Sequence, residues 1–177
     1  MYKRKYGRMT SAAWLNVELE QSSLFLTVLL GVLSAGAFII VRWNVGAPYR
    51  MMLELGIGDL IPPVWWFTLL QLVGFLTVGC AVGLVLGWRE KGCAADKYKG
   101  CLLGLLTILA ELCWYPCLFG RGMVFFALLL AIAALFLAVC TAVCFFRISG
   151  LSGILLSLHS VWLVYLLVLT CNVFFRN

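Results

Sequence analysis

The sequence predicts an all-α polytopic membrane protein, a single domain folded as a bundle of five transmembrane helices. The first observation is composition: of 177 residues, 64% are apolar and 11% are charged, whereas soluble proteins are about half apolar and about a quarter charged. The second is a mean hydropathy of +1.08. The third is that the apolar residues form five runs, each long enough to cross a bilayer at roughly 20 residues per helix. None of the runs shows the alternation of a membrane β-barrel.

The five expected helices share one domain of residues 1–177 and cover about 22–41, 64–88, 99–119, 123–146 and 153–175. The basic segment before the first run lacks the apolar stretch and cleavage site of a signal peptide, so we take this run as a membrane helix. Pro62 and Pro63 suit the first turn of the second helix, where a missing N–H costs nothing. A charged loop precedes the third helix. Short connections at 120–122 and 149–153 predict that the last three helices are antiparallel neighbours.

The longest connection, residues 42–63, is expected to fold back as a lid over one end of the bundle. Its Gly, Pro and Asp residues interrupt any continuing helix. Its Met51, Met52 and Ile57 are too apolar for a freely solvated loop.

The net charge of +6 is expected to reflect membrane topology and contact with lipid head groups, and not a nucleic-acid partner, because the charges lie at helix ends. With the N-terminus inside, nine basic residues fall on the inner side: Lys3, Arg4, Lys5, Arg8, Arg89, Lys91, Lys97, Lys99 and Arg147. Four fall outside: Arg42, Arg50, Arg121 and Arg176. This asymmetry predicts a cytoplasmic N-terminus, and the basic N-terminal segment favours a bacterial cytoplasmic membrane.

Eight cysteines are present, and six lie in the predicted spans: Cys80, Cys113, Cys117, Cys140, Cys144 and Cys171. Cys113 and Cys117 are four residues apart, as are Cys140 and Cys144, so the two members of each pair lie on one helix face. No second type of ligand lies nearby in the sequence, so we expect no metal site and interpret these residues as small apolar side chains. Cys93 and Cys101 could pair only in an oxidising compartment.

Small residues recur every four positions in three of the predicted helices: Gly79, Gly83 and Gly87; Gly100 and Gly104; and Ala134, Ala138 and Ala142. Such stripes let helix backbones approach closely in lipid. The spacing fits contacts within one bundle, and it also fits the interface of a homodimer.

Glu111 and His159 are the polar residues of interest within the spans. A carboxylate at membrane depth costs roughly 2.5–3.5 kcal/mol or more, so it faces a cavity or a partner. Glu111 therefore contacts a ligand or takes part in a proton-linked site, or it is a neutral, hydrogen-bonded acid that holds helices together. His159 could ligate a haem iron, but a hydrogen-bonded structural role is the simpler interpretation.

Aromatic residues gather on three helices: Trp65, Trp66, Phe67 and Phe75; Trp114, Tyr115 and Phe119; and Trp162 and Tyr165. An interfacial belt accounts for Trp43 and Trp88, and it extends to Trp65 and Trp66. Trp114 and Trp162 lie too deep for a belt. Each needs a partner for its indole N–H, and such rings stack on flat apolar ligands. No catalytic constellation or phosphate-binding loop is visible, so we do not expect an enzyme.

Four short patterns occur in the order found in one membrane-protein family. They are Pro62-Pro63 followed by Trp65; Phe75 with Gly79; the segment 110–120 with Glu111, Trp114 and Phe119; and Trp162 followed by Leu169-Thr170. Over roughly residues 50–177 the chain resembles the TspO/MBR family, which comprises the tryptophan-rich sensory proteins and the translocator proteins, also called peripheral benzodiazepine receptors.

The resemblance implies five membrane helices, often in a homodimer, and an intra-bundle pocket beneath the long loop. Family members bind porphyrin, haem and related tetrapyrroles, as well as cholesterol and benzodiazepine-type drugs. We therefore expect a receptor or transport protein that needs no cofactor and binds a flat apolar ligand, protoporphyrin or haem. By position, the pocket residues would be Trp65, Gln71, Phe75, Glu111, Trp114, Phe119, His159, Trp162 and Cys171.

Two alternatives stay open. Some bacterial members degrade porphyrin in light, but the aromatic residues associated with that activity are replaced here by Gln71 and Cys171. The other alternative is a membrane scaffold whose ligand site has been lost.

Overall fold

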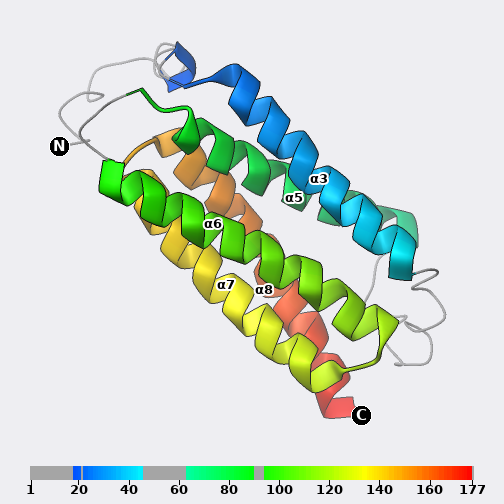
Figure 1. Ribbon diagram of the computed structural model, residues 1–177. Helices are drawn as coiled ribbons and strands as arrows, with labels where there is room; N and C mark the ends of the chain where they lie inside the picture. Colours follow the sequence, from blue (N-terminus) through cyan, green and yellow to red (C-terminus); the bar gives the residue numbers. More distant parts are fainter. Residues whose placement is uncertain (1–17, 21, 46–62, 90–93, 177) are drawn as a thin grey trace.

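The computed structural model describes residues 18–20, 22–45, 63–89 and 94–176. Five of its helices are long and apolar enough to cross a membrane (Figure 1). The elements that follow residue 23 are α3 (Leu24–Val45), α5 (Val64–Leu86), α6 (Ala94–Tyr115), the single π-helical turn η2 (Pro116–Gly120), α7 (Val124–Phe146) and α8 (Gly150–Arg176). The prediction of an all-α, five-helix membrane protein is thus confirmed.

Several helix boundaries differ from the predicted ones, and three of these differences have an identifiable setting in the structure. Helix α3 continues to Val45, beyond the predicted end at residue 41, and Arg42 lies in its last turn, where the helix dipole favours a basic side chain. Helix α6 begins at Ala94, with Asp96 in its first turn, where a carboxylate is favoured by the helix dipole. Of the predicted lid at 42–63, residues 42–45 belong to α3, and residues 46–62, with Pro62, lie outside the described residues, as does Cys93.

The third boundary, at the start of α8, depends on a buried carboxylate. Helix α8 begins at Gly150, inside the predicted connection 149–153. The Ser149 hydroxyl donates to Glu18 Oε2 (2.6 Å) and the Gly150 N–H donates to Glu18 Oε1 (3.3 Å). Glu18 is fully buried, so it satisfies donors at the helix N-terminus that would otherwise have no partner.

Helix α5 is central in the arrangement. It packs on α3 along one side and on α8 and α6 along others, while α7 packs against α6 and α8. Figure 1 shows α6 and α7 side by side with α8 behind them. The turn between η2 and α7 places Gly122 at φ 61°, a backbone conformation that glycine adopts without steric cost.

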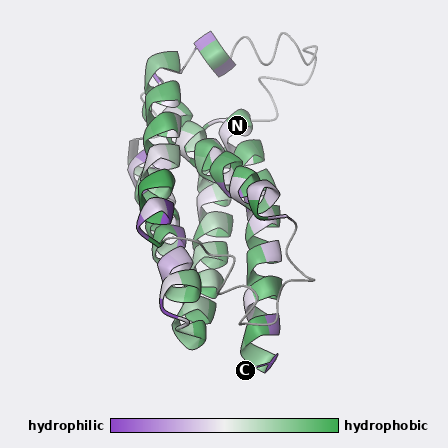
Figure 2. Ribbon diagram, turned by 90° about the vertical axis from the view of Figure 1, so that its right-hand side faces the viewer, coloured by the Kyte–Doolittle hydropathy of each residue, from purple (hydrophilic) through white to green (hydrophobic). Residues whose placement is uncertain are grey.

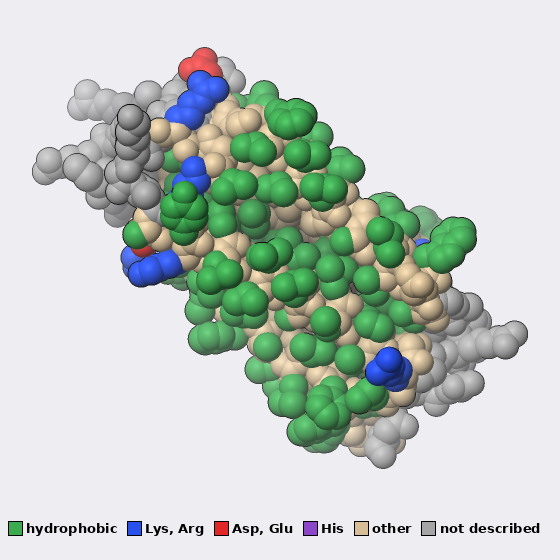
Figure 3. All heavy atoms as spheres, viewed as in Figure 1, with side chains coloured by type: hydrophobic (Ala, Val, Ile, Leu, Met, Phe, Trp, Pro, Cys, Tyr) green, Lys and Arg blue, Asp and Glu red, His purple; other side chains and the backbone are tan. Residues whose placement is uncertain are grey.

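The outer surface suits a lipid environment. Large apolar side chains on the outer faces of all five helices are exposed, among them Phe25 (73%), Phe136 (68%) and Val161 (68%). Figure 2 shows hydrophobic residues along the full length of the helices, and Figure 3 shows apolar side chains over the middle of the bundle with Lys and Arg near its ends. The chain is therefore an integral, multi-pass membrane protein.

The small-residue stripes form contacts within the bundle. A Cβ atom added at Gly83 would stand 2.5 Å from the Thr27 Cα, and one at Gly87 would stand 2.6 Å from the Ser23 backbone nitrogen, so α3 packs directly on this stripe of α5. A Cβ at Gly100 would stand 2.8 Å from the Phe145 ring, and Ala134 and Ala138 are buried. The spacing fitted either contacts within one bundle or a homodimer interface, and the structure shows contacts within the bundle.

We expect Gly83→Ala to destabilise the bundle by about 1–3 kcal/mol, because the added methyl group meets backbone atoms that can move only if α3 and α5 separate. The matched control is Gly36→Ala, since a Cβ at Gly36 meets nothing within 4 Å. Unfolding of the detergent-solubilised protein with increasing sodium dodecyl sulfate, followed by circular dichroism, measures both. Equal stability of the two variants would contradict the packing described above.

Candidate functional site

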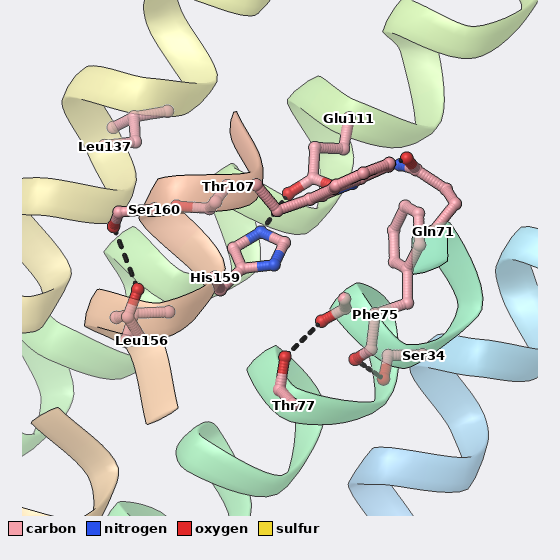
Figure 4. Close-up of polar contacts among 12 residues, drawn as sticks. Ser34, Gln71, Phe75, Thr77, Thr107, Glu111, Leu137, Leu156, His159 and Ser160 are labelled. Carbon is pink, nitrogen blue, oxygen red and sulfur yellow. Dashed lines mark hydrogen bonds and ion pairs between the residues drawn. The ribbon is translucent and has the colours of Figure 1, made fainter. Parts of the chain in front are cut away.

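A chain of hydrogen bonds crosses three helices in the bundle interior. The Trp162 indole N–H on α8 donates to Gln71 Oε1 on α5 (2.8 Å), and Gln71 Nε2 donates to Glu111 Oε2 on α6 (3.3 Å). The other Glu111 oxygen lies 2.5 Å from His159 Nε2 on α8. Gln71, Glu111 and His159 are almost completely buried (0%, 2% and 2% exposed). Figure 4 shows Glu111 and His159 pointing toward one another. We call these four residues the polar quartet.

The polar quartet ties α5, α6 and α8 together at membrane depth. Hydrocarbon supplies no water to an unpaired polar group, so each such group must find a partner within the protein. A single proton between Glu111 Oε1 and His159 Nε2 is enough to form their hydrogen bond, whether the carboxyl group or the imidazole ring carries it. Of the roles foreseen for Glu111 and His159, the hydrogen-bonded contact between helices is the one seen in the structure.

An aromatic cluster lies beside the quartet, on the side toward the start of α5 and the end of α6. Its rings are buried and their centroids lie 5.1–5.9 Å apart in the closest pairs: Phe38, Phe67, Phe75, Trp114, Tyr115 and Phe119. The Trp114 indole N–H donates to Thr170 Oγ1 (3.1 Å). The prediction that Trp114 and Trp162 need partners for their N–H groups is therefore confirmed.

Local backbone geometry brings part of this cluster inward. Pro116 lacks an N–H group and interrupts the hydrogen-bond ladder of α6, which continues as the π-helical turn η2. The Arg121 N–H then bonds to the Pro116 carbonyl, five residues back. Leu118 and Phe119 on this turn are buried.

The structure brings together seven of the nine residues expected to line the pocket. They are Gln71, Phe75, Glu111, Trp114, Phe119, His159 and Trp162, of which only Trp162 is partly exposed. Trp65 is 62% exposed and stacks on Trp66 with ring centroids 4.6 Å apart, as the belt hypothesis allowed. Cys171 is half-buried, with a free thiol. Trp88 is buried (5% exposed), packed near Phe145, so its assignment to a lipid-facing belt was wrong.

Sequence reasoning left four contributors out of the site: Phe38, Phe67, Tyr115 and Thr170. For three of them, helical spacing in the sequence could have indicated that they share a face with predicted site residues. Phe67 shares a face of α5 with Gln71 and Phe75 at intervals of four, and Tyr115 lies four residues after Glu111. Thr170 falls on the His159–Trp162 face of α8. Phe38 had no such signal, because no motif singled out a residue of the first helix.

Metal ligands do not gather in the described part of the chain. Within residues 18–20, 22–45, 63–89 and 94–176, no group of three or more His, Cys, Asp or Glu side chains could hold a metal ion. The Glu111–His159 pair supplies two such groups. The described cysteines, including the pairs Cys113/Cys117 and Cys140/Cys144, are free thiols.

Fold and site together define a polytopic helical membrane protein whose interior holds a polar chain against a cluster of aromatic rings. The family model described as the TspO/MBR family matches residues 23–176, nearly the whole chain. The chain belongs to this family. No curated protein and no solved structure matched the chain significantly.

Proposed function

We propose that this TspO/MBR protein binds a flat apolar ligand, a tetrapyrrole such as protoporphyrin or haem, inside the bundle. The observation that carries the proposal is the polar quartet buried against the aromatic cluster. Aromatic rings can stack on a macrocycle or contact it with their edges. The quartet supplies hydrogen-bonding groups beside the aromatic cluster. A site of mostly apolar walls with a few polar groups is typical of small-molecule binding.

Two arginines at the same end of the bundle favour a ligand with carboxylate groups. Arg42 lines a groove of about 310 Å³ between α3 and α5, together with Phe38. Arg121 lines a second groove, of about 400 Å³, between α3 and η2. Guanidinium groups form strong, bidentate hydrogen bonds with carboxylates, so they suit the two propionate groups of protoporphyrin.

The interior is closely packed, and ligand entry requires the rings of Phe67, Phe119 and Trp114 to separate. This packing also favours the second candidate, a membrane scaffold without a ligand. Protoporphyrin that fails to bind at micromolar concentration, together with a partner that co-purifies, would support the scaffold. Light-dependent loss of porphyrin absorbance that pocket substitutions abolish would instead indicate a tetrapyrrole-degrading enzyme.

We expect protoporphyrin to quench the tryptophan fluorescence of the purified protein, and Trp114→Phe to remove a large share of that quenching. The reason is that Trp114 lies within the aromatic cluster. Trp88→Phe is the matched control, because Trp88 is equally buried but packs near Phe145 at the other end of α5. Phenylalanine preserves most of the packing in both variants. Unchanged quenching in Trp114→Phe and in Trp162→Phe would contradict the proposed pocket.

Location and assembly complete the proposal. The nine-to-four distribution of basic residues favours an N-terminus on the inner side, and the basic N-terminal segment favours a bacterial cytoplasmic membrane. A homodimer, which the family resemblance suggests, would have to use faces other than the glycine stripe of α5, because α3 covers that stripe.

A further inference from the structure

The second ring nitrogen of His159 has no partner. The His159 side chain is fully buried, and its Nδ1 atom makes no hydrogen bond, whereas Nε2 contacts Glu111. In Figure 4 this nitrogen lies on the side of the ring that faces α5. The nearest position on α5 is Gly74, where an added Cβ would stand 3.2 Å from Nδ1. Glycine thus leaves space next to a buried nitrogen that any larger residue would crowd.

His159 and Gly74 belong to a groove between α5 and α8. The groove has a volume of about 340 Å³, and His159, Gly74 and Trp162 are among its lining residues. Val73 and Val161 also line it and are 46% and 68% exposed, so the groove opens to the outside of the bundle, where lipid lies. It shares His159 and Trp162 with the polar quartet, and the Trp162 ring lies 5.8 Å from Phe67 of the aromatic cluster, but none of the six rings of that cluster lines the groove.

Four residues that line this groove carry polar side-chain groups: Thr77, His159, Trp162 and Tyr165. The Trp162 indole N–H already donates to Gln71. The Thr77 hydroxyl donates to the Gly74 carbonyl (2.7 Å). His159 Nδ1 is the lining atom that is both buried and without a partner in the described residues. Burying a polar atom without a hydrogen bond is unfavourable, so a molecule that pairs with Nδ1 gains affinity there.

We propose that this groove binds a lipophilic phenol, a membrane-dissolved molecule with one hydroxyl group on a flat apolar ring. A hydroxyl fits either state of His159: it donates to Nδ1 when Nε2 carries the proton, and it accepts from Nδ1–H otherwise. A flat ring fits the wall formed by Trp162 and Tyr165, whose ring centroids lie 4.9 Å apart. The apolar remainder of the molecule lies along Val73 and Val161. The inference does not rest on tetrapyrrole binding.

The test uses the single histidine of the chain. Protein labelled with ¹⁵N-histidine, without added histidines, is reconstituted in nanodiscs and titrated with 4-octylphenol. We expect a saturable shift of the Nδ1 signal, and no comparable shift with octylbenzene, which lacks the hydroxyl. An equal shift with octylbenzene, or none with octylphenol, would overturn the proposal.

A pair of variants locates the binding. Val161→Trp fills the mouth of the groove and is expected to weaken octylphenol binding by about tenfold. Val143→Trp is the matched control, since Val143 is 52% exposed on α7, away from the groove. Octylphenol affinity unchanged by Val161→Trp would refute the site. Protoporphyrin quenching, measured on the same variants, keeps the two proposals apart: it should survive Val161→Trp, and Trp114→Phe should leave octylphenol binding intact.

Discussion

Replacing Glu111 with leucine is expected to destabilise the bundle by about 3–5 kcal/mol, the usual cost of removing one partner from a buried, hydrogen-bonded pair. Glu111 accepts from Gln71 and contacts His159 with its two oxygens. Leucine leaves both partners buried without these contacts. The free energy of unfolding, measured by titration with sodium dodecyl sulfate, gives the loss.

A double variant separates the pair from the packing around it. His159→Leu alone leaves one carboxylate oxygen unpaired, whereas Glu111→Leu/His159→Leu removes both members of the pair. We expect the double variant to be more stable than the sum of the single losses predicts, by about 0.5–3 kcal/mol, as for residues in direct contact. Glu111→Gln, which keeps a hydrogen-bonding group of similar size, should lose less than Glu111→Leu. Strict additivity would show that Glu111 and His159 act independently.

Hydropathy alone was sufficient to predict the five helices, because each crossing needs a long apolar run. It could not place the start of α8, where Glu18 accepts hydrogen bonds from Ser149 and Gly150, since hydropathy does not register single hydrogen bonds. The family resemblance named most of the residues that gather inside the bundle. It also assigned Trp65 to the pocket, whereas in the structure Trp65 is 62% exposed and stacks on Trp66. Hydropathy and motif do not tell how a residue in the first helical turn is rotated.

The polar quartet illustrates what a sequence without its fold does not reveal. Gln71 and Glu111 are separated by 40 positions, and Glu111 and His159 by 48. Each was visible as a polar residue in an apolar span. That they meet depends on the rotation and relative height of α5, α6 and α8. Contacts such as that of Gly104 on α6 with Val82 on α5, where an added Cβ would stand 2.8 Å away, determine this arrangement. The unpartnered Nδ1 of His159 follows from the same geometry.

Trp114→Ala is expected to cost about 3–5 kcal/mol of unfolding free energy, as for other large-to-small changes at buried aromatic positions. Trp114 is 1% exposed and contacts Tyr115 and Phe119, with ring centroids 6.4 and 5.7 Å away. Most of the loss should come from the emptied volume and not from the hydrogen bond to Thr170, which contributes about 1 kcal/mol.

Thr170→Val tests this division, because it removes the acceptor for the Trp114 N–H while it nearly preserves side-chain volume. The Thr170 hydroxyl also donates to the Leu166 carbonyl within α8 (2.7 Å), so the variant loses a second, local contact. If Thr170→Val destabilised the protein as much as Trp114→Ala, the hydrogen bond would dominate and the packing account would be wrong. If Trp114→Ala were instead almost neutral, the cluster would have collapsed into the space, and its rings would be mobile enough to admit a flat ligand.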